Sequence, residues 1–384
     1  MKILILSCNT GEGHNSSARA LKNAMEARGI DCEMQDTLAL VSADVSKNVS
    51  EAYIFSTKSS LFEKLYKIGE TISSWESFSK SPIYLANKLY TKKLYDKIKI
   101  GGYDAVICVH LFPAEALTAL RRKAELHIPA IFVMTDYTCI PFLPETELDR
   151  YVIAHEDLVE EFVEKGIARE KIVPLGIPVD EAMYKSRLNK RQAREMLHKE
   201  FSWAPVPEDS KWFLLMGGSM GFGNMGDLIT SLLDSCGEND RLICVCGRNG
   251  EMKEQLDRDF HSEERLLTTG FTDKVSVLMD ASDVLFSKPG GITSTEAVLK
   301  QLPLIHTAPI PGLESYNAHF FHYHNMSYST RDPKIQAEIA IRLCRDGKYR
   351  RRMTDAQVRN SYPDCCDDII TLASNLQKQL LDQY

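Results

Sequence analysis

The stretch 287–296 joins an apolar run to a helical pattern through a glycine turn. It reads Ser-Lys-Pro-Gly-Gly-Ile-Thr-Ser-Thr-Glu and follows the apolar residues of 283–286. Proline fixes φ, two glycines let the backbone approach a ligand closely, and Thr293 or Ser294 can cap the following helix. The first amides of such a helix are unpaired and lie at the positive end of its dipole, which predicts an anion site. Glu296 would lie near that anion, so a phosphate beside a hydroxyl-bearing sugar fits, while an ordinary Gly-Gly turn is the alternative.

Apolar strands alternate with helical patterns in two series. The first series begins with the strand 2–8 and the second with the strand 211–216. A glycine-rich loop follows each first strand, at 10–14 and at 217–223. Alternating βα units indicate parallel sheets covered by helices, and glycine loops at the carboxyl edge of such sheets are typical ligand sites. The pattern breaks near 180–184, so we expect an α/β protein with two doubly wound domains that face a central cleft.

The expected domains are 1–180 and 181–362, followed by a helical segment at 363–384 that can cross back to the first domain. A chain of 384 residues has room for a full core in each domain. The net charge of −7 argues against nucleic acid as the main partner.

The cysteines and the apolar runs bear on location. The ten cysteines lie mostly within apolar runs and form no zinc-type CxxC pair, which favours free thiols in a reducing cytoplasm. The sequence starts directly on a buried-type strand, without a signal-peptide pattern. No apolar run reaches about 18 residues, so we expect no membrane-spanning helix.

The stretch 42–100 differs in character from the rest of the chain. Its segment 47–99 contains ten lysines and five acidic residues, interleaved with Trp, Phe and Tyr side chains. Lysines and aromatics on amphipathic segments suit an anionic membrane surface. The alternative is that the aromatics are core residues and the lysines form a solvated face.

Several motifs along the chain can be matched to a known family. The amino end has Thr10-Gly-Glu-Gly-His-Asn-Ser-Ser-Ala18, and the carboxyl half has three motifs in a row: Lys288-Pro-Gly-Gly-Ile-Thr-Ser-Thr-Glu-Ala297, Leu302-Pro-Leu-Ile305, and Pro309-Ile-Pro-Gly312 with Glu314-Ser-Tyr-Asn-Ala318. Together they resemble glycosyltransferase family 28. The nearer branch is that of the monogalactosyldiacylglycerol synthases and processive diacylglycerol glucosyltransferases. The more distant branch is the GlcNAc transferase of peptidoglycan synthesis.

This resemblance implies a GT-B fold, with two Rossmann-like domains, and sugar transfer from a UDP-sugar with inversion. It implies that the donor is bound without a metal or other cofactor. By matching positions, Glu296 would hold the ribose hydroxyls and amides near Phe271 would read uracil. The implied donor-binding residues are Gly218, Ser219, Arg248, Phe271, Thr272, Lys288, Pro289, Gly290, Gly291, Ile292, Thr293, Glu296, Glu314 and Asn317. Of these, the resemblance assigns Gly290, Gly291 and Ile292 to phosphate, and Glu314 and Asn317 to the donor sugar.

The acceptor side of the expected site depends on two titratable residues. An inverting transfer needs a base that takes the proton of the acceptor hydroxyl. His14, in a loop with Gly11 and Gly13, and Asp136, at a strand's carboxyl end, could each serve. We favour Asp136 as the base and His14 as an assisting group. The alternatives are a turn histidine for His14 and a helix or turn cap for Asp136.

Two departures from the resembled branch concern the acceptor and the donor sugar. The branch usually has a His and a Trp after its Thr-Asp pair, where this chain has Ile140, Phe142 and Leu143. It also usually has Gln where this chain has Leu313, and Leu cannot hydrogen-bond sugar hydroxyls. The donor class is therefore better defined than the sugar itself.

The expected function is transfer of glucose or galactose from a UDP-hexose to diacylglycerol or a glycolipid. The first domain would bind the acceptor and face the membrane through 47–99, on the inner face of the cell membrane as a cytoplasmic, peripheral protein. Two alternatives stay open: a UDP-GlcNAc-type transferase with a prenyl-linked or soluble acceptor, and a UDP-sugar sensor without turnover.

Overall fold

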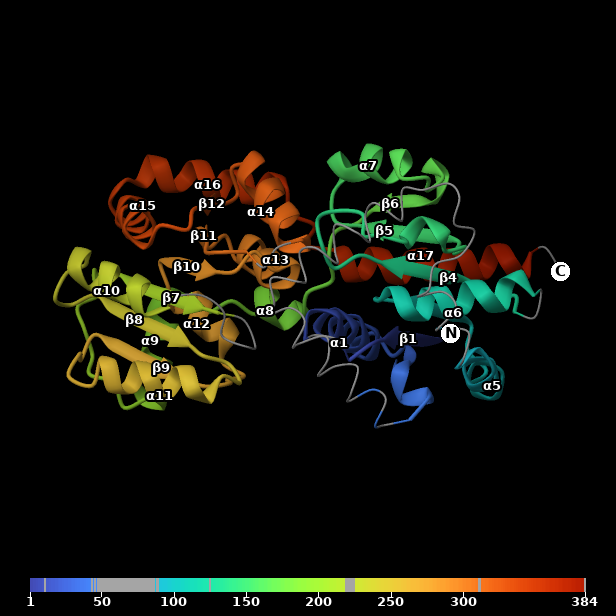
Figure 1. Cartoon of the computed structure of the whole chain (residues 1–384), viewed down its shortest axis with the longest axis horizontal. Coiled ribbons are helices and arrows are strands. Elements are labelled where there is room, and N and C mark those ends of the chain that lie inside the picture. Colours follow the sequence, from blue (N-terminus) through green and yellow to red (C-terminus); the bar gives the residue numbers. More distant parts are fainter. Residues whose placement is uncertain are drawn as a thin grey trace. The chain divides into compact units, whose positions relative to one another are not determined.

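The computed structural model describes residues 1–9, 12–42, 44, 46, 87, 90–123, 126–217, 225–309 and 312–382. Most of the lysine- and aromatic-rich segment 47–99 lies outside these residues, as do Gly11, Gly218 and Ser219. The chain divides into two compact units, which are described separately (Figure 1). Unit 1 comprises Met1–Asp180, Pro311–Leu313 and Tyr362–Tyr384, and unit 2 comprises Glu181–Ile310 and Glu314–Ser361.

Unit 1 contains a six-stranded sheet in the order β2-β1-β3-β4-β5-β6, in which all neighbouring strands are parallel. The strands are β1 (Lys2–Ser7), β2 (Asp31–Asp36), β3 (Ala105–Cys108), β4 (Ala130–Val133), β5 (Arg150–Ile153) and β6 (Ile172–Pro174). The helices are α1 (Glu12–Ala27), α5 (Thr91–Gly101), α6 (Leu111–Arg122), α7 (Val159–Glu164) and α17 (Cys365–Leu381). The central strands are apolar throughout because helices cover both faces of a parallel sheet.

The carboxyl-terminal helix α17 belongs to the core of unit 1 and lies among the amino-terminal elements in Figure 1. Its Cys365, Ile369 and Ala373 side chains share one buried cluster with Ile3 of β1 and Leu21 of α1. Burying a side chain as large as that of Ile369 or Leu21 stabilises a fold by about 1.5–3 kcal/mol. The last helix therefore holds unit 1 together.

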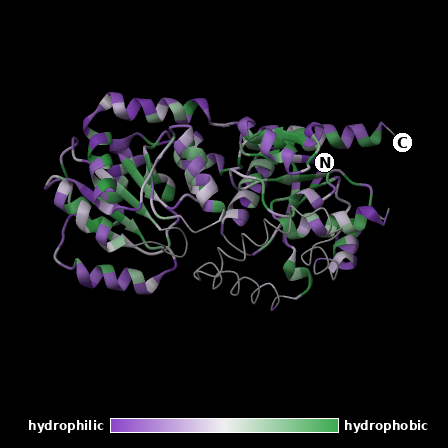
Figure 2. Cartoon of the chain, turned by 45° about the horizontal axis from the view of Figure 1, so that its top comes forward, coloured by the Kyte–Doolittle hydropathy of each residue, from purple (hydrophilic) through white to green (hydrophobic). Residues whose placement is uncertain are grey.

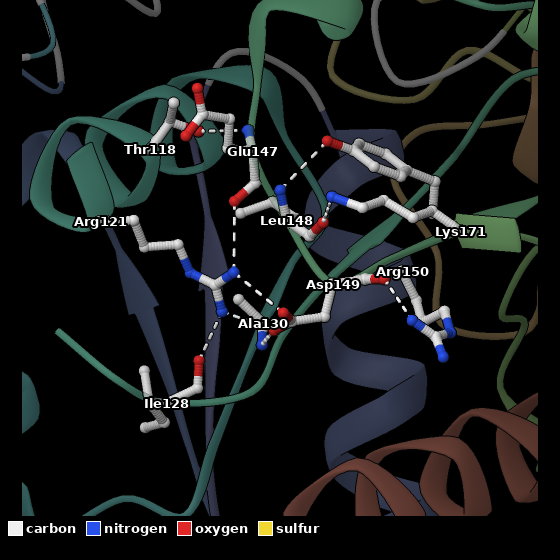
Figure 3. Close-up of polar contacts among 10 residues, drawn as sticks. Thr118, Arg121, Ile128, Ala130, Glu147, Leu148, Asp149, Arg150 and Lys171 are labelled. Carbon is white, nitrogen blue, oxygen red and sulfur yellow. Dashed lines mark hydrogen bonds and ion pairs between the residues drawn. The ribbon is translucent and has the colours of Figure 1, made fainter. Parts of the chain in front are cut away.

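A polar network fixes the sheet edge of unit 1 at which β4 and β5 begin (Figure 3). The Arg121 guanidinium, at the end of α6, donates to Asp149 Oδ1 (3.0 Å) and to the carbonyl of Ile128 (2.6 Å). The same aspartate accepts from the Ala130 amide (2.7 Å), and Lys171 donates to the Leu148 carbonyl (3.1 Å). Charge-assisted bonds of this kind are stronger than neutral ones, so they tie α6 to the sheet.

Unit 2 contains a second six-stranded parallel sheet, in the order β12-β11-β10-β7-β8-β9. The strands are β7 (Trp212–Met216), β8 (Arg241–Val245), β9 (Leu266–Thr269), β10 (Val284–Ser287), β11 (Leu304–His306) and β12 (Tyr328–Ser329). The helices are α8 (Glu181–Lys185), α9 (Lys190–Glu200), α10 (Met225–Ser235), α11 (Gly250–Asp259), α12 (Val275–Ala281), α13 (Gly291–Leu299), α14 (Leu313–Tyr323), α15 (Pro333–Arg345) and α16 (Gly347–Arg359).

Hydropathy follows the layers of each unit. Figure 2 shows hydrophobic residues on the strands and hydrophilic residues on the outward sides of the helices. The strands β7, β8 and β10 are buried along their whole length, which agrees with sheets covered on both faces. All ten cysteines are free thiols. Within the described ranges, none of the helices has both the length and the apolar character that crossing a membrane requires.

Candidate active site

Strand order places one topological switch point in each sheet. In unit 1 the chain runs from β1 outward to β2 and then returns to β3 on the other side of β1. In unit 2 it runs from β7 outward to β8 and β9 and then returns to β10 beside β7. Ligands of doubly wound proteins bind outside the carboxyl ends of the strands at such points. The residues after β1, β3, β7 and β10 are therefore the first candidates.

At the switch point of unit 1, His14 lies in the first turn of α1. Its Nδ1 atom is 2.9 Å from the carbonyl oxygen of Val109, the residue after β3, and 3.1 Å from Thr135 Oγ1. A carbonyl can only accept a hydrogen bond, so Nδ1 carries the proton and donates it to Val109. The other ring nitrogen, Nε2, then has a free lone pair that can accept a proton.

The surroundings keep this imidazole neutral. Burial lowers the pKa of His14, and the Asp136 carboxylate and the bond to Val109 act in the opposite direction. A second imidazole, His110, packs edge-to-face against it with 4.6 Å between the ring centroids. Burial, and then repulsion from His14 when that ring is protonated, hold the pKa of His110 well below its ordinary value. His14 can therefore act as a proton acceptor near neutral pH.

The structure brings the two residues of the expected acceptor side together. Thr135, which contacts His14, also donates to Asp136 Oδ2 at 3.5 Å. Asp136 is half-buried, and its charge raises the pKa of His14. Gly13 lies exposed in the first turn of α1. Helix α1 begins at Glu12, within the glycine-rich loop expected at 10–14, so His14 lies on the helix and not in the preceding loop.

At the switch point of unit 2, β10 leads through Lys288 and Pro289 into α13, whose N-cap is Gly290. Gly290 has an extended backbone (φ −75°, ψ 139°), and no side chain caps the helix. No acidic residue occupies the first turn of α13. The first amides of the helix and its positive dipole end thus lack a capping side chain, as an anion site requires.

The expectation that Thr293 or Ser294 caps this helix is wrong, because the helix begins earlier, at Gly291. Both residues lie inside it, and the Ser294 hydroxyl instead lies 2.9 Å from Nε2 of the buried His306. The Thr295 hydroxyl donates to the Gly291 carbonyl (2.7 Å). Ile292, Thr293 and Glu296 are half-buried on the same helix.

Helix α14 supports the loop between β10 and α13. Lys288 Nζ forms an ion pair with the Glu314 carboxylate. Asn317 is fully buried and donates from Nδ2 to the carbonyl of Pro289 at 3.0 Å. Both residues that the resemblance assigns to the donor sugar therefore hold the loop itself. A loop braced at both Lys288 and Pro289 presents its amides in a fixed geometry.

The loops after β8 and β9 place an aromatic ring at the same sheet edge. Phe271 is 65% exposed, and the Arg248 guanidinium lies 5.4 Å from the ring centroid. Thr272 Oγ1 accepts from the Lys274 amide at 3.0 Å. An exposed aromatic face beside a cation can stack on a planar base.

Sequence analysis did not single out His110, nor the Val109 carbonyl as the partner of His14. His110 follows a buried strand directly, which is the same signal that identified Asp136. The carbonyl bond joins residues 95 positions apart and involves no side chain at 109, so the pattern of residue types contains no trace of it.

Comparison with known proteins agrees, over most of the chain, with the family resemblance found in the sequence motifs. Residues 14–179 match the family model described as monogalactosyldiacylglycerol (MGDG) synthase. A processive diacylglycerol beta-glucosyltransferase of Bacillus cytotoxicus is 26% identical over 371 residues, covering 92% of this chain and 88% of that protein. Its counterpart in Bacillus pumilus is 26% identical over 380 residues, covering 96% and 94%.

Solved structures share the fold. UDP-GlcNAc 2-epimerase from Neisseria meningitidis, bound to UDP-GlcNAc, has a TM-score of 0.64 at 13% identity and covers 97% of this chain and 99% of its own. The S. aureus MnaA–UDP co-structure has a TM-score of 0.63 at 14% identity and covers 96% and 94%. With two doubly wound parallel sheets, the chain has the GT-B fold. In sequence, the chain is similar to the monogalactosyldiacylglycerol synthase family model and to the processive diacylglycerol beta-glucosyltransferases.

Proposed function

We propose that this protein is an inverting glycosyltransferase that moves glucose or galactose from a UDP-hexose to diacylglycerol or a glycolipid. The observation that carries this proposal is the tautomer of His14, which leaves Nε2 as a proton acceptor at the switch point of unit 1. The names of the relatives, which act on diacylglycerol, support the acceptor class. The uncapped helix α13 supports a donor with a diphosphate.

In the proposed reaction, His14 Nε2 takes the proton of the acceptor hydroxyl as its oxygen attacks the anomeric carbon. The Val109 carbonyl holds the ring in the required tautomer, and the Asp136 carboxylate stabilises the imidazolium that forms. The sequence-based preference for Asp136 as the base is thereby reversed. The reason is geometric, because the hydrogen bond at Nδ1 prepares His14 for this role.

On the donor side, the amides at the start of α13 would hold the diphosphate, including its charge when UDP leaves. Glu296, half-buried about one turn into that helix, would accept from the ribose hydroxyls. Phe271 and Arg248 would contact the uracil. Since amides and the helix dipole supply the positive potential, we expect transfer to persist in EDTA.

We further propose that the protein works at the inner face of the cell membrane, as a peripheral protein. The basic, aromatic segment 47–99 motivates this location, since lysines attract anionic lipid and aromatic rings favour the interface. Flotation with vesicles tests it: binding to anionic vesicles that weakens with salt is expected. Absence of binding at low salt would contradict it.

The transfer reaction has a direct test. The full chain is incubated with UDP-glucose or UDP-galactose and diacylglycerol vesicles, and the lipid products are read by mass. A hexosyl-diacylglycerol is the expected product. Product formed only with a prenyl-linked or soluble acceptor would overturn the acceptor class, and UDP binding without any product would favour a sensor.

A further inference from the structure

A cavity of about 260 Å³ lies in unit 2 at the sheet edge where β10 and β11 begin. The donor loop lies at the other end of α13, so this cavity is a separate feature. Its charged lining residues are Arg187, Lys190, Lys300, Arg350 and Asp280. Four cations and one carboxylate thus surround the same space.

The carboxylate in the lining is already engaged. Asp280 is almost fully buried and accepts from Lys300 Nζ at 2.6 Å and from the Leu188 amide at 3.1 Å. Arg187 Nε lies 4.0 Å from it, and the same guanidinium donates to the Lys300 carbonyl at 2.5 Å. The single Asp280 carboxylate therefore faces two cations, Lys300 and Arg187.

A second carboxylate, Asp283, stands beside the cavity and is shared in the same way. It accepts from Lys190 Nζ (2.5 Å), from Arg194 Nη2 (2.9 Å) and from the Trp212 amide (2.9 Å). The lining itself has four cations and one carboxylate, and Asp283 lies beside it. Outside the lining, Glu296 acts on Lys300 and Asp240 acts on Arg194. The excess of cations is therefore a property of the lining.

The electrostatics of the two lysines agree with this excess. Burial lowers the pKa of Lys190 despite Asp283, and the nearby Arg350 acts in the same direction. Burial also lowers the pKa of Lys300 despite Asp280, and Arg187 adds to the effect. Arg350, half-buried on α16, forms no side-chain hydrogen bond or ion pair with any residue that the structure describes. A partly buried positive excess of this kind is unfavourable until an anion neutralises it.

The cavity in unit 1 has a smaller excess of positive charge. Its cavity of about 630 Å³ is lined by Arg121, Arg150 and Lys171, and also by Glu147 and Asp149. Arg121 is clamped by Asp149, as Figure 3 shows. Of the two cavities, the one in unit 2, with four cations and one carboxylate, therefore has the larger excess of positive charge in its lining.

We propose that the cavity of unit 2 binds a phosphate dianion, as free phosphate or as the phosphate group of a small ester. Arg350 and Lys190 bind its oxygens, and Arg187 contributes a further cation of the lining. The volume lies just below the range of about 300–1,000 Å³ typical of small-molecule sites, so the ligand is small. This site is independent of the proposed transfer reaction.

Thermal unfolding of the full chain in sodium phosphate, at constant ionic strength and pH 7.5, tests the proposal. A ligand that binds only the folded protein raises Tm in proportion to the logarithm of its concentration above Kd, so a rise of about 4 °C or more is expected at about 100 times Kd. Arg350→Gln should weaken phosphate binding, so the phosphate concentration needed for a given rise in Tm should increase by about tenfold or more. The matched control is Arg351→Gln, which removes an exposed arginine one position away and should respond like the wild type.

Phosphate bound at the start of α13 would persist in Arg350→Gln, so the difference between the two variants isolates the cavity. Titration calorimetry of the wild type provides a second readout that needs no variant. A third arm of the experiment replaces free phosphate by vesicles that contain an anionic phospholipid. If Tm responds only to the vesicles, and this response depends on Arg350, the bound phosphate is that of a lipid headgroup. No saturable phosphate or vesicle response, or equal loss in both variants, would overturn the site.

Discussion

The two sheets have related topologies, yet their switch points hold different groups. In unit 1, α1 has a carboxylate of the chain, Glu12, in its first turn, and Arg19 pairs with it at 3.2 Å. In unit 2, α13 has no acidic residue there and starts from a glycine. A helix amino end that already has a carboxylate beside it has less attraction for a further anion. The two units thus divide the expected chemistry, with proton transfer in unit 1 and diphosphate binding in unit 2.

Two histidines sharpen the contrast. His14 lies at a sheet edge with Nε2 available, and the Asp136 carboxylate raises its pKa. His306 in unit 2 is fully buried, and both of its ring nitrogens are occupied, by Ser294 (2.9 Å) and Ser327 (3.1 Å). The same residue type therefore has one ring nitrogen available to accept a proton in unit 1 and two hydrogen-bonded ring nitrogens in unit 2. Fold sets the position of a site, and the residues there set its chemistry.

The largest effect is expected from His14→Gln. An amide can keep the hydrogen bond to Val109 but cannot take a proton, so kcat should fall by about 10²–10⁴-fold. The affinity for UDP, which depends on unit 2, should not change. Transfer assays and UDP titration measure the two quantities. His127→Gln, at an exposed histidine of unit 1, is the control. Loss of UDP binding in His14→Gln would break the division between the units.

The reciprocal change in unit 2 is Gly290→Ala. A methyl group there would have Lys288 Nζ as its nearest neighbour, at 3.6 Å, which is ordinary van der Waals contact. The fold should therefore tolerate it, while the diphosphate loses its close approach to the amides. We expect UDP affinity to fall by about tenfold or more, as the loss of a charge-assisted hydrogen bond implies.

Titration calorimetry with UDP and a Tm measurement check this expectation together. Gly347→Ala is the matched control, because it changes another glycine at a helix start in unit 2, where the nearest atom lies 3.9 Å away. Unchanged UDP affinity in Gly290→Ala would remove the start of α13 as the phosphate site.

Much of this architecture could be predicted from local pattern. Apolar runs such as residues 3–6, each followed by a glycine loop and a helical pattern, led to two parallel-sheet domains. Strand order could not be read, since pairing depends on contacts between segments far apart in sequence. The helix starts were placed too late, after the loop 10–14 and at a cap on Thr293 or Ser294, because Gly13 and Gly291 were treated as loop residues. Glycine is tolerated in a first turn, where few intrahelical bonds are lost.

The residues of the candidate site could be predicted from the sequence, but their hydrogen bonds could not. Asp136 and the glycines of 290–291 follow strands directly, which is a local signal. The tautomer of His14 depends on a backbone carbonyl from another strand, and backbone carbonyls are present at every position. The bond from Asn317 to the Pro289 carbonyl escaped prediction for the same reason.

A smaller effect is expected from His306→Gln and concerns stability. Burial lowers the pKa of His306 to about 3, against about 6.5 in the unfolded chain. As pH falls below 6.5, His306 takes up a proton in the unfolded state, whereas in the folded state it takes up this proton only near pH 3. Stability is lost over this window by up to about 1.4 kcal/mol per pH unit.

His306→Gln removes this dependence, so its stability should fall less between pH 7 and pH 5 than that of the wild type. The difference should be about 2 kcal/mol. Urea unfolding followed by tryptophan fluorescence measures it, since Trp203 and Trp212 both lie in unit 2. His319→Gln, at an exposed position of the same unit, should keep the wild-type pH dependence. Equal slopes for wild type and His306→Gln would mean that His306 takes up a proton in the fold.

The smallest effect, and the one that separates the two candidate bases, is expected from Asp136→Asn. The Asp136 carboxylate raises the pKa of His14, so its removal should lower that pKa further. If His14 is the base, the acidic limb of kcat/KM moves to lower pH. Turnover above neutral pH then falls only about tenfold, because the imidazolium loses a stabilising charge. If Asp136 is the base, turnover is lost at every pH, and the pH profile of this one variant decides between them.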